Sequence, residues 1–131
     1  MKKSEELVRL ACEAMKNSYS PYSGFRVGAA LRCEDGSVFV GCNIENSAFS
    51  PTCCAERTAF FKAVSEGKNK FSEIAVVGGK DGVISDFCYP CGVCRQVMRE
   101  FCSEDFLIHL YDGNKIQTLS LKELLPFGFS L

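Results

Sequence analysis

The chain has 131 residues, of which 47% are hydrophobic and 24% are charged, proportions typical of a globular domain and not of a disordered chain. Its 15 basic and 16 acidic residues give a net charge of −1, which excludes a protein that binds polyanions through a basic surplus. No apolar run approaches the roughly 18 residues of a membrane-spanning helix, and the start of the chain lacks the apolar centre of a signal peptide. We therefore expect a cytoplasmic protein with neither a membrane nor a nucleic-acid partner.

The N-terminal segment predicts a helix and then a loop. Ser4 is placed to cap the helix, and apolar residues then recur at helical spacing until the helix stops near Asn17. Residues 18–24 contain proline and glycine and predict a loop.

Alternating apolar residues over 25–33 predict a strand that is buried on one face. Asp35-Gly36 is a strong two-residue turn signal, so residues 37–42 form the returning strand of a hairpin. A polar, irregular stretch follows over 43–50.

Pro51 fits the first position of a second helix capped by Ser50, with Thr52 as an alternative cap. This helix runs to Ser65 or Glu66, and Gly67 closes it. The remaining predicted elements are a strand at 74–77, loops at 78–79 and 81–82, a helix at 91–102, strands at 106–111 and 115–119 joined by a turn at 112–114, and a short helix opened by the capping box at 120–123 and stopped by Pro126.

Helices that alternate with strands predict an α/β fold in three layers, α/β/α, around a mixed sheet of roughly five strands. No repeat of 20–50 residues and no Gly/Ser/Pro linker divides the chain, so we expect one domain over residues 1–131.

Nine cysteines are unusual for this length. An odd number leaves one thiol over from any complete disulfide framework, and clustered cysteines in a reducing cytosol are more often metal ligands or catalytic groups. We expect a few of them to be ligands and the rest to be small buried hydrophobic residues.

Two cysteine segments open predicted helices, one at Cys54 and the other at Cys91 and Cys94. Cys91 and Cys94 are three residues apart, which places both sulfurs on one helical face. A helix N-terminus lowers the pKa of a thiol, and three thiolates suit zinc. Three protein ligands leave the fourth tetrahedral position to water, as in catalytic zinc sites.

Glu56, two residues after Cys54, can lean over the open side of the metal and accept a proton from its water. Three thiolates and Zn²⁺ sum to a charge of −1, which opposes loss of that proton. Arg57, on the same helical face as Cys54, is the first candidate for the compensating cation, with Arg95 second. This Cys-x-Glu and Pro-Cys-x-x-Cys arrangement is the signature of zinc nucleobase deaminases, with cysteine at the first ligand position.

From Ser4 to about Phe129 the sequence resembles the small homotetrameric zinc-dependent cytidine deaminases. Besides the cysteine motifs, the shared segments are PYSGFRVGAA (21–30), GCNIEN (41–46), CGVCRQ (91–96) and LLP (124–126). The resemblance implies one zinc ion per subunit and the hydrolysis of cytidine and 2′-deoxycytidine to uridine and 2′-deoxyuridine in pyrimidine salvage. It also implies a homotetramer whose active sites are shared between subunits.

The resemblance implies the following site residues: zinc ligands Cys54, Cys91 and Cys94; proton shuttle Glu56; a cation on the thiolates, Arg57; and substrate contacts Phe25, Asn43, Glu45, Ala55 and, from a neighbouring subunit, Phe129, with Phe127 as its alternative. Asn43 and Glu45 are two residues apart, so in an extended segment they point to one side, where an amide and a carboxylate can together hold a sugar hydroxyl.

The sequence departs from the family at Phe49, where tyrosine is usual, and at Tyr89, where serine or threonine is usual. His109, the only histidine, lies on a predicted strand and is interpreted as a structural residue. The cysteines interpreted as structural are Cys12, Cys33, Cys42, Cys53, Cys88 and Cys102.

Four other functions compete with this one. A blasticidin S deaminase shares the zinc motifs, and the Asn43–Glu45 pair favours a nucleoside instead. A structural zinc module would close the metal with a fourth ligand, Cys53 or Cys88. A thiol–disulfide oxidoreductase would use Cys91 and Cys94. Editing of RNA or DNA is disfavoured because no basic stripe with interleaved aromatic residues is present.

Overall fold

The computed structural model, which describes residues 1–131, has one mixed five-stranded sheet in the order β2-β1-β3-β4-β5. The strands are β1 (Phe25–Cys33), β2 (Val38–Cys42), β3 (Phe71–Lys80), β4 (Leu107–Tyr111) and β5 (Ile116–Ser120). Only β3 and β4 pair in parallel; the other three pairs are antiparallel.

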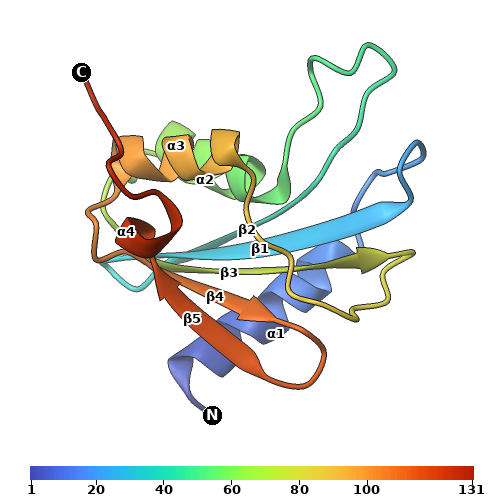
Figure 1. Ribbon diagram of the computed structural model, residues 1–131, viewed down its shortest axis with the longest axis horizontal. Coiled ribbons are helices and arrows are strands. Elements are labelled where there is room, and N and C mark those ends of the chain that lie inside the picture. Colours follow the sequence, from blue (N-terminus) through green and yellow to red (C-terminus); the bar gives the residue numbers. More distant parts are fainter.

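Helices cover both faces of this sheet (Figure 1). Helix α1 (Lys3–Met15) lies on one face, and α2 (Ala55–Ser65), α3 (Gly92–Phe101) and the short α4 (Leu121–Leu124) lie on the other. Each face has its own apolar cluster, a smaller one beneath α1 and a larger one beneath α2 and α3. The predicted three-layer α/β/α fold is confirmed.

Two glycines let the helices approach the sheet closely. A Cβ at Gly28 in β1 would lie 2.0 Å from the carbonyl oxygen of Ala11 in α1. A Cβ at Gly41 in β2 would lie 2.6 Å from the carbonyl oxygen of Ala55 and 2.7 Å from the backbone nitrogen of Ala59. The missing side chain at Gly41 therefore brings the first turns of α2 directly against the sheet.

Two predicted helix starts are wrong. Helix α1 begins at Lys3 after Lys2, and Ser4 caps nothing, because it lies inside the first turn. Helix α2 begins at Ala55, not at Pro51, with Cys54 at the N-cap and neither Ser50 nor Thr52 capping it. The cause is an antiparallel bridge between Ile44 and Cys53, which keeps the chain extended up to the helix.

Strand β3 is longer than the predicted strand at 74–77. Gly78 and Gly79, predicted as a loop, belong to β3 and pair with Val27 and Arg26 of β1. The nine residues of β1 supply pairing partners along almost the whole of β3, and this backbone pairing outweighs the loop tendency of two glycines. The turn at 81–82 follows directly.

The other predicted elements are found within a few residues of their expected bounds. The capping box is present, since Ser120 accepts from the Glu123 backbone and Glu123 accepts from the Ser120 backbone. His109 is buried and lies 2.8 Å from both Thr118 Oγ1 and Glu73 Oε1, which confirms it as a structural residue. None of the helices has the length and apolar character needed to cross a membrane.

Candidate active site

The N-termini of α2 and α3 meet above the sheet and bring together three cysteines. Cys54 is the N-cap of α2, Cys91 is the N-cap of α3, and Cys94 lies in the first turn of α3. Their three sulfurs all lie within 4.8 Å of one another. Residues from two segments of the chain are thus positioned to bind one metal ion.

The spacing of the sulfurs fits zinc. The Sγ atoms of Cys54 and Cys91 are 3.9 Å apart, and two sulfurs at the usual Zn–S distance in a tetrahedral site are about 3.8 Å apart. The group of mutually close ligand atoms comprises these three cysteines and includes neither Cys53 nor Cys88. Three protein ligands and an open position are typical of catalytic zinc sites and not of structural ones.

The cluster favours thiolates. Hydrogen bonding from Cys94, followed by hydrogen bonding from Arg57, lowers the pKa of Cys54 to about 5. The same contact with Cys54, together with burial, raises the pKa of Cys94. The surroundings of Cys54 therefore favour its thiolate form, and a bound cation favours ionisation of the other two sulfurs.

Arg57 supplies the positive charge beside the sulfurs. Its Nη2 donates to Cys54 Sγ at 3.1 Å, and this bond raises the pKa of the guanidinium. The other candidate, Arg95, is used elsewhere, because it donates to the carbonyl oxygens of Pro90 and Leu124, each at 2.7 Å. Arg57 thus remains as the cation that offsets the thiolate charge.

Glu56 lies in the first turn of α2 with only 4% of its surface exposed. Burial raises the pKa of its carboxyl to about 7. A buried acid at the wall of a pocket, next to a metal-binding cluster, is the arrangement expected for a group that moves protons.

A pocket of about 280 Å³ opens beside the cysteines. Most of the predicted site residues line it, namely Phe25, Asn43, Glu45, Cys54, Ala55, Glu56 and Cys91. Cys94 is fully buried and is not among the lining residues. Residues that are far apart in the sequence are thus brought together by β1, the segment after β2 and the starts of α2 and α3.

The side-chain amide of Asn43 is mostly occupied by the protein itself. Its Oδ1 accepts from the backbone N–H of Val27 at 2.8 Å and from the hydroxyl of Ser18. Its Nδ2 donates to the carbonyl oxygen of Phe25 at 2.8 Å. Since an amide has two acceptor sites and two N–H groups, one N–H remains for a ligand.

The carboxylate of Glu45 is held in the same way. Its Oε1 accepts from the backbone N–H groups of Tyr22 and Ser23 at 2.9 and 3.1 Å, and Oε2 accepts from the Ser23 hydroxyl. The side-chain hydrogen bond from Ser23 is the largest of the effects that lower the pKa of Glu45. Glu45 therefore has a carboxylate lone pair left to accept a hydrogen bond from a ligand, and Asn43 has one N–H left to donate one.

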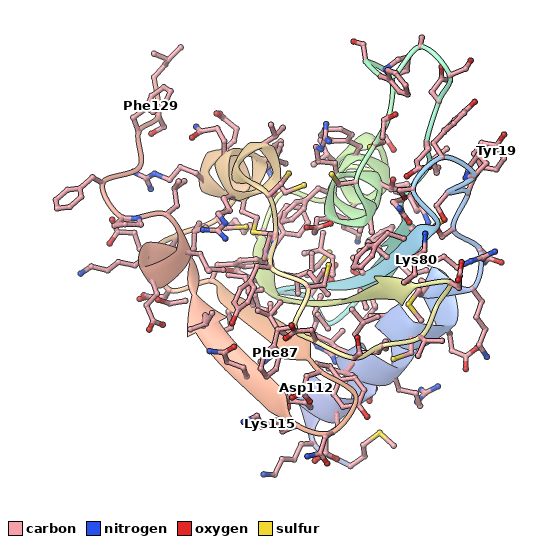
Figure 2. The ribbon with its side chains drawn as sticks, turned by 45° about the vertical axis from the view of Figure 1, so that its right-hand side comes forward. Tyr19, Lys80, Phe87, Asp112, Lys115 and Phe129 are labelled. Carbon is pink, nitrogen blue, oxygen red and sulfur yellow. The ribbon has the colours of Figure 1, made fainter.

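Phe129 does not lie in this pocket. It is 65% exposed on the C-terminal segment, where its carbonyl oxygen accepts from Gln96 Nε2 at 3.1 Å. Figure 2 shows it beyond the helical layer, at the opposite end of the molecule from Tyr19. Its expected substrate contact therefore needs a second copy of the chain.

The pocket also contains residues that the sequence did not single out as contacts. These additional lining residues are Ser23, Val27, Thr52, Cys53, Cys88 and Tyr89. Cys53 and Cys88, interpreted from the sequence as structural, thus face the site. The sequence does hold a signal for these two residues: Cys53 is next to Cys54, and Cys88 comes shortly before Pro90-Cys91, so both lie close to expected metal ligands.

Tyr89, one of the departures from the family pattern, lines the pocket, but its hydroxyl is anchored outside it. Its hydroxyl donates to Gln117 Oε1 at 3.1 Å, and Gln117 belongs to β5, at the edge of the sheet away from β1. The bulky ring is thereby tied toward the β5 edge. Phe49, the other departure, is 72% exposed.

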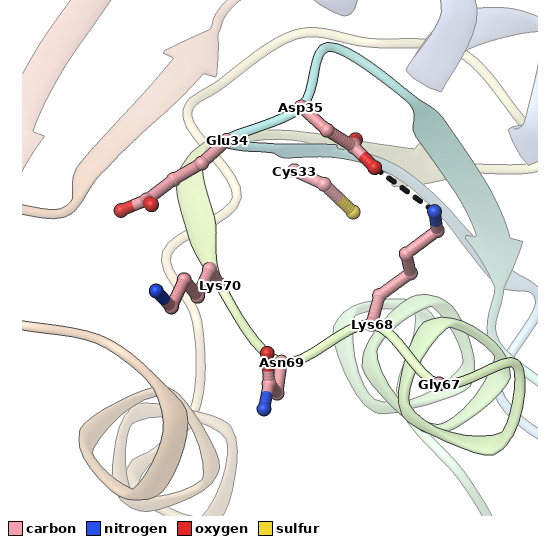
Figure 3. A pocket seen from close by; sticks show the side chains of 7 residues that line it. All are labelled: Cys33, Glu34, Asp35, Gly67, Lys68, Asn69 and Lys70. Carbon is pink, nitrogen blue, oxygen red and sulfur yellow. Dashed lines mark hydrogen bonds and ion pairs between the residues drawn. The ribbon is translucent and has the colours of Figure 1, made fainter.

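A second hollow lies at the opposite end of β1, where the hairpin turn faces the loop after α2 (Figure 3). Asp35 and Lys68 form an ion pair across it at 2.9 Å. Glu34 and Lys70 add one charge of each sign, so the hollow has no net charge and no cluster of catalytic groups.

The fold and the site together define a zinc-binding deaminase domain. Residues 1–110 match the family described as the cytidine and deoxycytidylate deaminase zinc-binding region. The chain belongs to this family, whose members are hydrolytic enzymes.

Relatives agree over nearly the whole chain. A cytidine deaminase of Sporosarcina psychrophila is 49% identical over 96% of this chain and 90% of its own length. The crystal structure of a cytidine deaminase from Burkholderia pseudomallei superposes with a TM-score of 0.88 at 40% identity, covering 98% of this chain and 100% of the other. A blasticidin-S deaminase of Bacillus cereus is 30% identical over 95% of this chain and 91% of its own length.

Proposed function

We propose that this enzyme hydrolyses cytidine and 2′-deoxycytidine to uridine and 2′-deoxyuridine with release of ammonia, as a single-domain cytoplasmic enzyme of pyrimidine salvage. One observation carries the choice of substrate. Two cysteines of the three-cysteine cluster and a buried carboxyl line the same pocket as Asn43, which has a remaining donor, and Glu45, which has a remaining acceptor.

Cys54, Cys91 and Cys94 would hold one zinc ion. When bound, zinc lowers the pKa of a water molecule and so supplies the nucleophile at neutral pH. Arg57 reduces the negative charge of the sulfurs through its bond to Cys54 Sγ.

Glu56 is the catalytic proton carrier. It accepts a proton from the attacking water and delivers it to the ring nitrogen, which makes C4 of the cytosine ring more electrophilic. It then carries the second proton of that water to the departing amino group, so that cytidine and water become uridine and ammonia. Its near-complete burial excludes bulk water from these transfers.

Asn43 and Glu45 bind the sugar. A hydroxyl group accepts one hydrogen bond and donates another, which complements the N–H left on Asn43 and the oxygen left on Glu45. A site built to satisfy a hydroxyl rejects ligands without it more strongly than an apolar pocket does. Phe25 and Ala55 contact the base in the same pocket.

The active form is a homotetramer in which Phe129 reaches the pocket of a neighbouring subunit. Support comes from the C-terminal segment, on which the aromatic side chains of Phe127 and Phe129 are both largely exposed. The pocket contains no residue from that segment of its own chain.

Steady-state assays of zinc-loaded enzyme on cytidine, 2′-deoxycytidine and blasticidin S test the reaction. We expect uridine and ammonia in equal amounts from cytidine, and loss of activity by a factor of about 10²–10⁴ in Glu56→Gln with zinc retained. Faster turnover of blasticidin S than of cytidine would overturn the proposed choice of substrate. If neither the wild type nor Glu56→Gln released ammonia, the protein would be a structural zinc module and not an enzyme.

The zinc content of two serine variants tests the ligands. Cys91→Ser loses zinc and stability, because metal binding is coupled to folding. Cys88→Ser is the matched control, since Cys88 lines the same pocket but lies outside the cluster, and it keeps a full complement of zinc. Unchanged zinc in Cys91→Ser would refute the ligand assignment. A functional Cys91–Cys94 redox pair would instead show itself by reversible oxidation without zinc.

A further inference from the structure

The loop after α1 supports the segment that carries Asn43 and Glu45. The backbone N–H of Tyr19 donates to the carbonyl oxygen of Asn43 at 3.0 Å, and the N–H of Glu45 donates to the carbonyl oxygen of Tyr19 at 2.8 Å. Tyr19 and Ile44 form a parallel bridge. The backbone around the two sugar-binding residues is thus fixed by residues that lie far from them in the sequence.

Ser18 is the buried polar residue of this loop. It is 8% exposed, and its backbone N–H donates to the carbonyl oxygen of Met15 at 3.1 Å, just beyond the end of α1. Its hydroxyl donates to Asn43 Oδ1. The position of the hydroxyl is therefore set by α1, which is packed against the sheet.

The contact from Ser18 changes what Asn43 offers to a ligand. Asn43 Oδ1 has two acceptor sites, and Val27 fills only one of them. Ser18 fills the second, so a ligand meets a donor and no acceptor. The hydroxyl of a sugar must then accept from Asn43 and donate to Glu45, which fixes its orientation.

We propose that Ser18 is a positioning residue that sets the specificity of this enzyme for the sugar hydroxyl by saturating Asn43 Oδ1. The inference rests on the proposed role of Asn43 in binding the nucleoside. Without the Ser18 hydroxyl, the amide regains an acceptor and loses one of the contacts that hold it in place. The hydroxyl can then bind in more than one orientation, and recognition weakens.

The test compares kinetics on cytidine with kinetics on 2′,3′-dideoxycytidine, which keeps the base and lacks both secondary hydroxyls. We expect Ser18→Ala to raise KM for cytidine about 3- to 10-fold with kcat unchanged, and to leave both constants for the dideoxynucleoside unchanged. Ser18→Thr keeps the hydroxyl and restores a low KM. Ser20→Ala is the matched control. The Ser20 hydroxyl donates to Ser18 Oγ at 3.3 Å and makes no bond to Asn43, so its removal leaves the Ser18–Asn43 bond in place and KM for cytidine unchanged.

Asn43→Ala, measured in parallel, separates the inference from the function on which it rests. If Asn43→Ala raises KM for cytidine selectively and Ser18→Ala does not, the role of Ser18 is overturned and that of Asn43 stands. If neither variant discriminates between the two nucleosides, the proposed binding of the sugar by Asn43 fails. An equal rise of KM for both nucleosides in Ser18→Ala would show a general structural role and refute the inference.

Discussion

Arg57 donates from Nη2 to the Sγ of Cys54 at 3.1 Å, which places a permanent positive charge beside a cluster of three sulfurs. The bond exists because the two residues are three positions apart at the start of one helix. The sulfurs can therefore carry the negative charge that zinc binding requires.

Replacing Arg57 with glutamine removes that charge. We expect zinc affinity to fall about 10- to 100-fold, as is usual when a group that supports a metal ligand is lost. Arg57→Lys retains a cation without the planar guanidinium and gives a smaller loss. Competition with a chromogenic chelator measures the affinities, and equal values for wild type and Arg57→Gln would show that the bond is unimportant for the metal.

Helix α2 carries both Cys54 and Glu56, and Gly41 sets its distance from the sheet. Gly41→Ala forces the new Cβ against the backbone of Ala55 and Ala59, with contacts of 2.6 and 2.7 Å. We expect the free energy of unfolding to fall by about 1–3 kcal/mol, and activity to fall with it because the start of α2 is displaced.

Gly92→Ala is the control for this prediction. A Cβ at Gly92 meets no atom within 4 Å, so the free energy of unfolding stays unchanged or rises by about 0.4–1 kcal/mol. Urea unfolding of the zinc-loaded proteins measures both changes. A neutral Gly41→Ala would mean that α2 can move away from the sheet at little cost.

The sequence predicts which residues come together at the site better than it predicts the local backbone. Cys54 and Cys91 were identified because metal ligands have a characteristic spacing, and that spacing does not depend on where a helix begins. The sequence predicts that α2 starts at Pro51, since Ser50 and Pro51 have the local preferences of a helix start. The bridge between Ile44 and Cys53 overrides those preferences, and no local pattern reveals a pairing between separate segments.

The same limit applies to the pocket and to the sheet. The sequence places Asn43 and Glu45 on one side of an extended segment, whereas the contacts from Ser18 and Ser23 come from a loop 25 and 22 residues earlier, respectively. The sequence predicts a loop at Gly78-Gly79, because the pairing of these residues with β1 is a tertiary interaction. Long-range contacts thus account for what the sequence alone left open.

The effect of acid pH on substrate binding tests whether the hydrogen bond from Ser23 keeps Glu45 ionised. The Ser23 hydroxyl bond is the first cause that holds the pKa of Glu45 below its ordinary value of 4.5. The ionised carboxylate of Glu45 accepts a hydrogen bond from the sugar more strongly than the neutral acid does. Binding is therefore strongest at pH values above this lowered pKa and weakens as the pH falls through it. Ser23→Ala raises the pKa, and the loss then begins at higher pH.

We expect KM for cytidine to rise earlier in Ser23→Ala than in wild type as the pH is lowered from neutral to about pH 4. Each KM is divided by the KM for 2′,3′-dideoxycytidine at the same pH, which cancels effects of acid on the metal site. Superimposable ratios for the two proteins would show that Ser23 does not control the ionisation of Glu45.

Phe129 provides the sharpest test of a site shared between subunits. Phe129→Ala leaves the pocket of its own chain intact, since Phe129 does not line it. We nevertheless expect kcat/KM for cytidine to fall about 10- to 100-fold, because removing an aromatic side chain that stacks on a base costs about 1–3 kcal/mol, with zinc content unchanged.

Mixing inactive subunits shows where the missing side chain acts. Glu56→Gln subunits retain Phe129, and Phe129→Ala subunits retain Glu56. Co-assembly therefore builds some pockets in which an intact Glu56 meets the Phe129 of a neighbour, and activity rises above the sum of the separate proteins.

Two further mixtures are the controls. Phe129→Ala is first mixed with Asn43→Ala instead of Glu56→Gln. The Asn43→Ala subunit has a defective pocket of its own, but it supplies an intact Phe129 to its neighbour and restores activity in the same way. Glu56→Gln mixed with Asn43→Ala restores nothing, because both defects lie in the pocket of a single chain and neither is supplied by a neighbour. If Phe129→Ala with Glu56→Gln gives only the sum of the separate activities, Phe129 does not act across a subunit boundary.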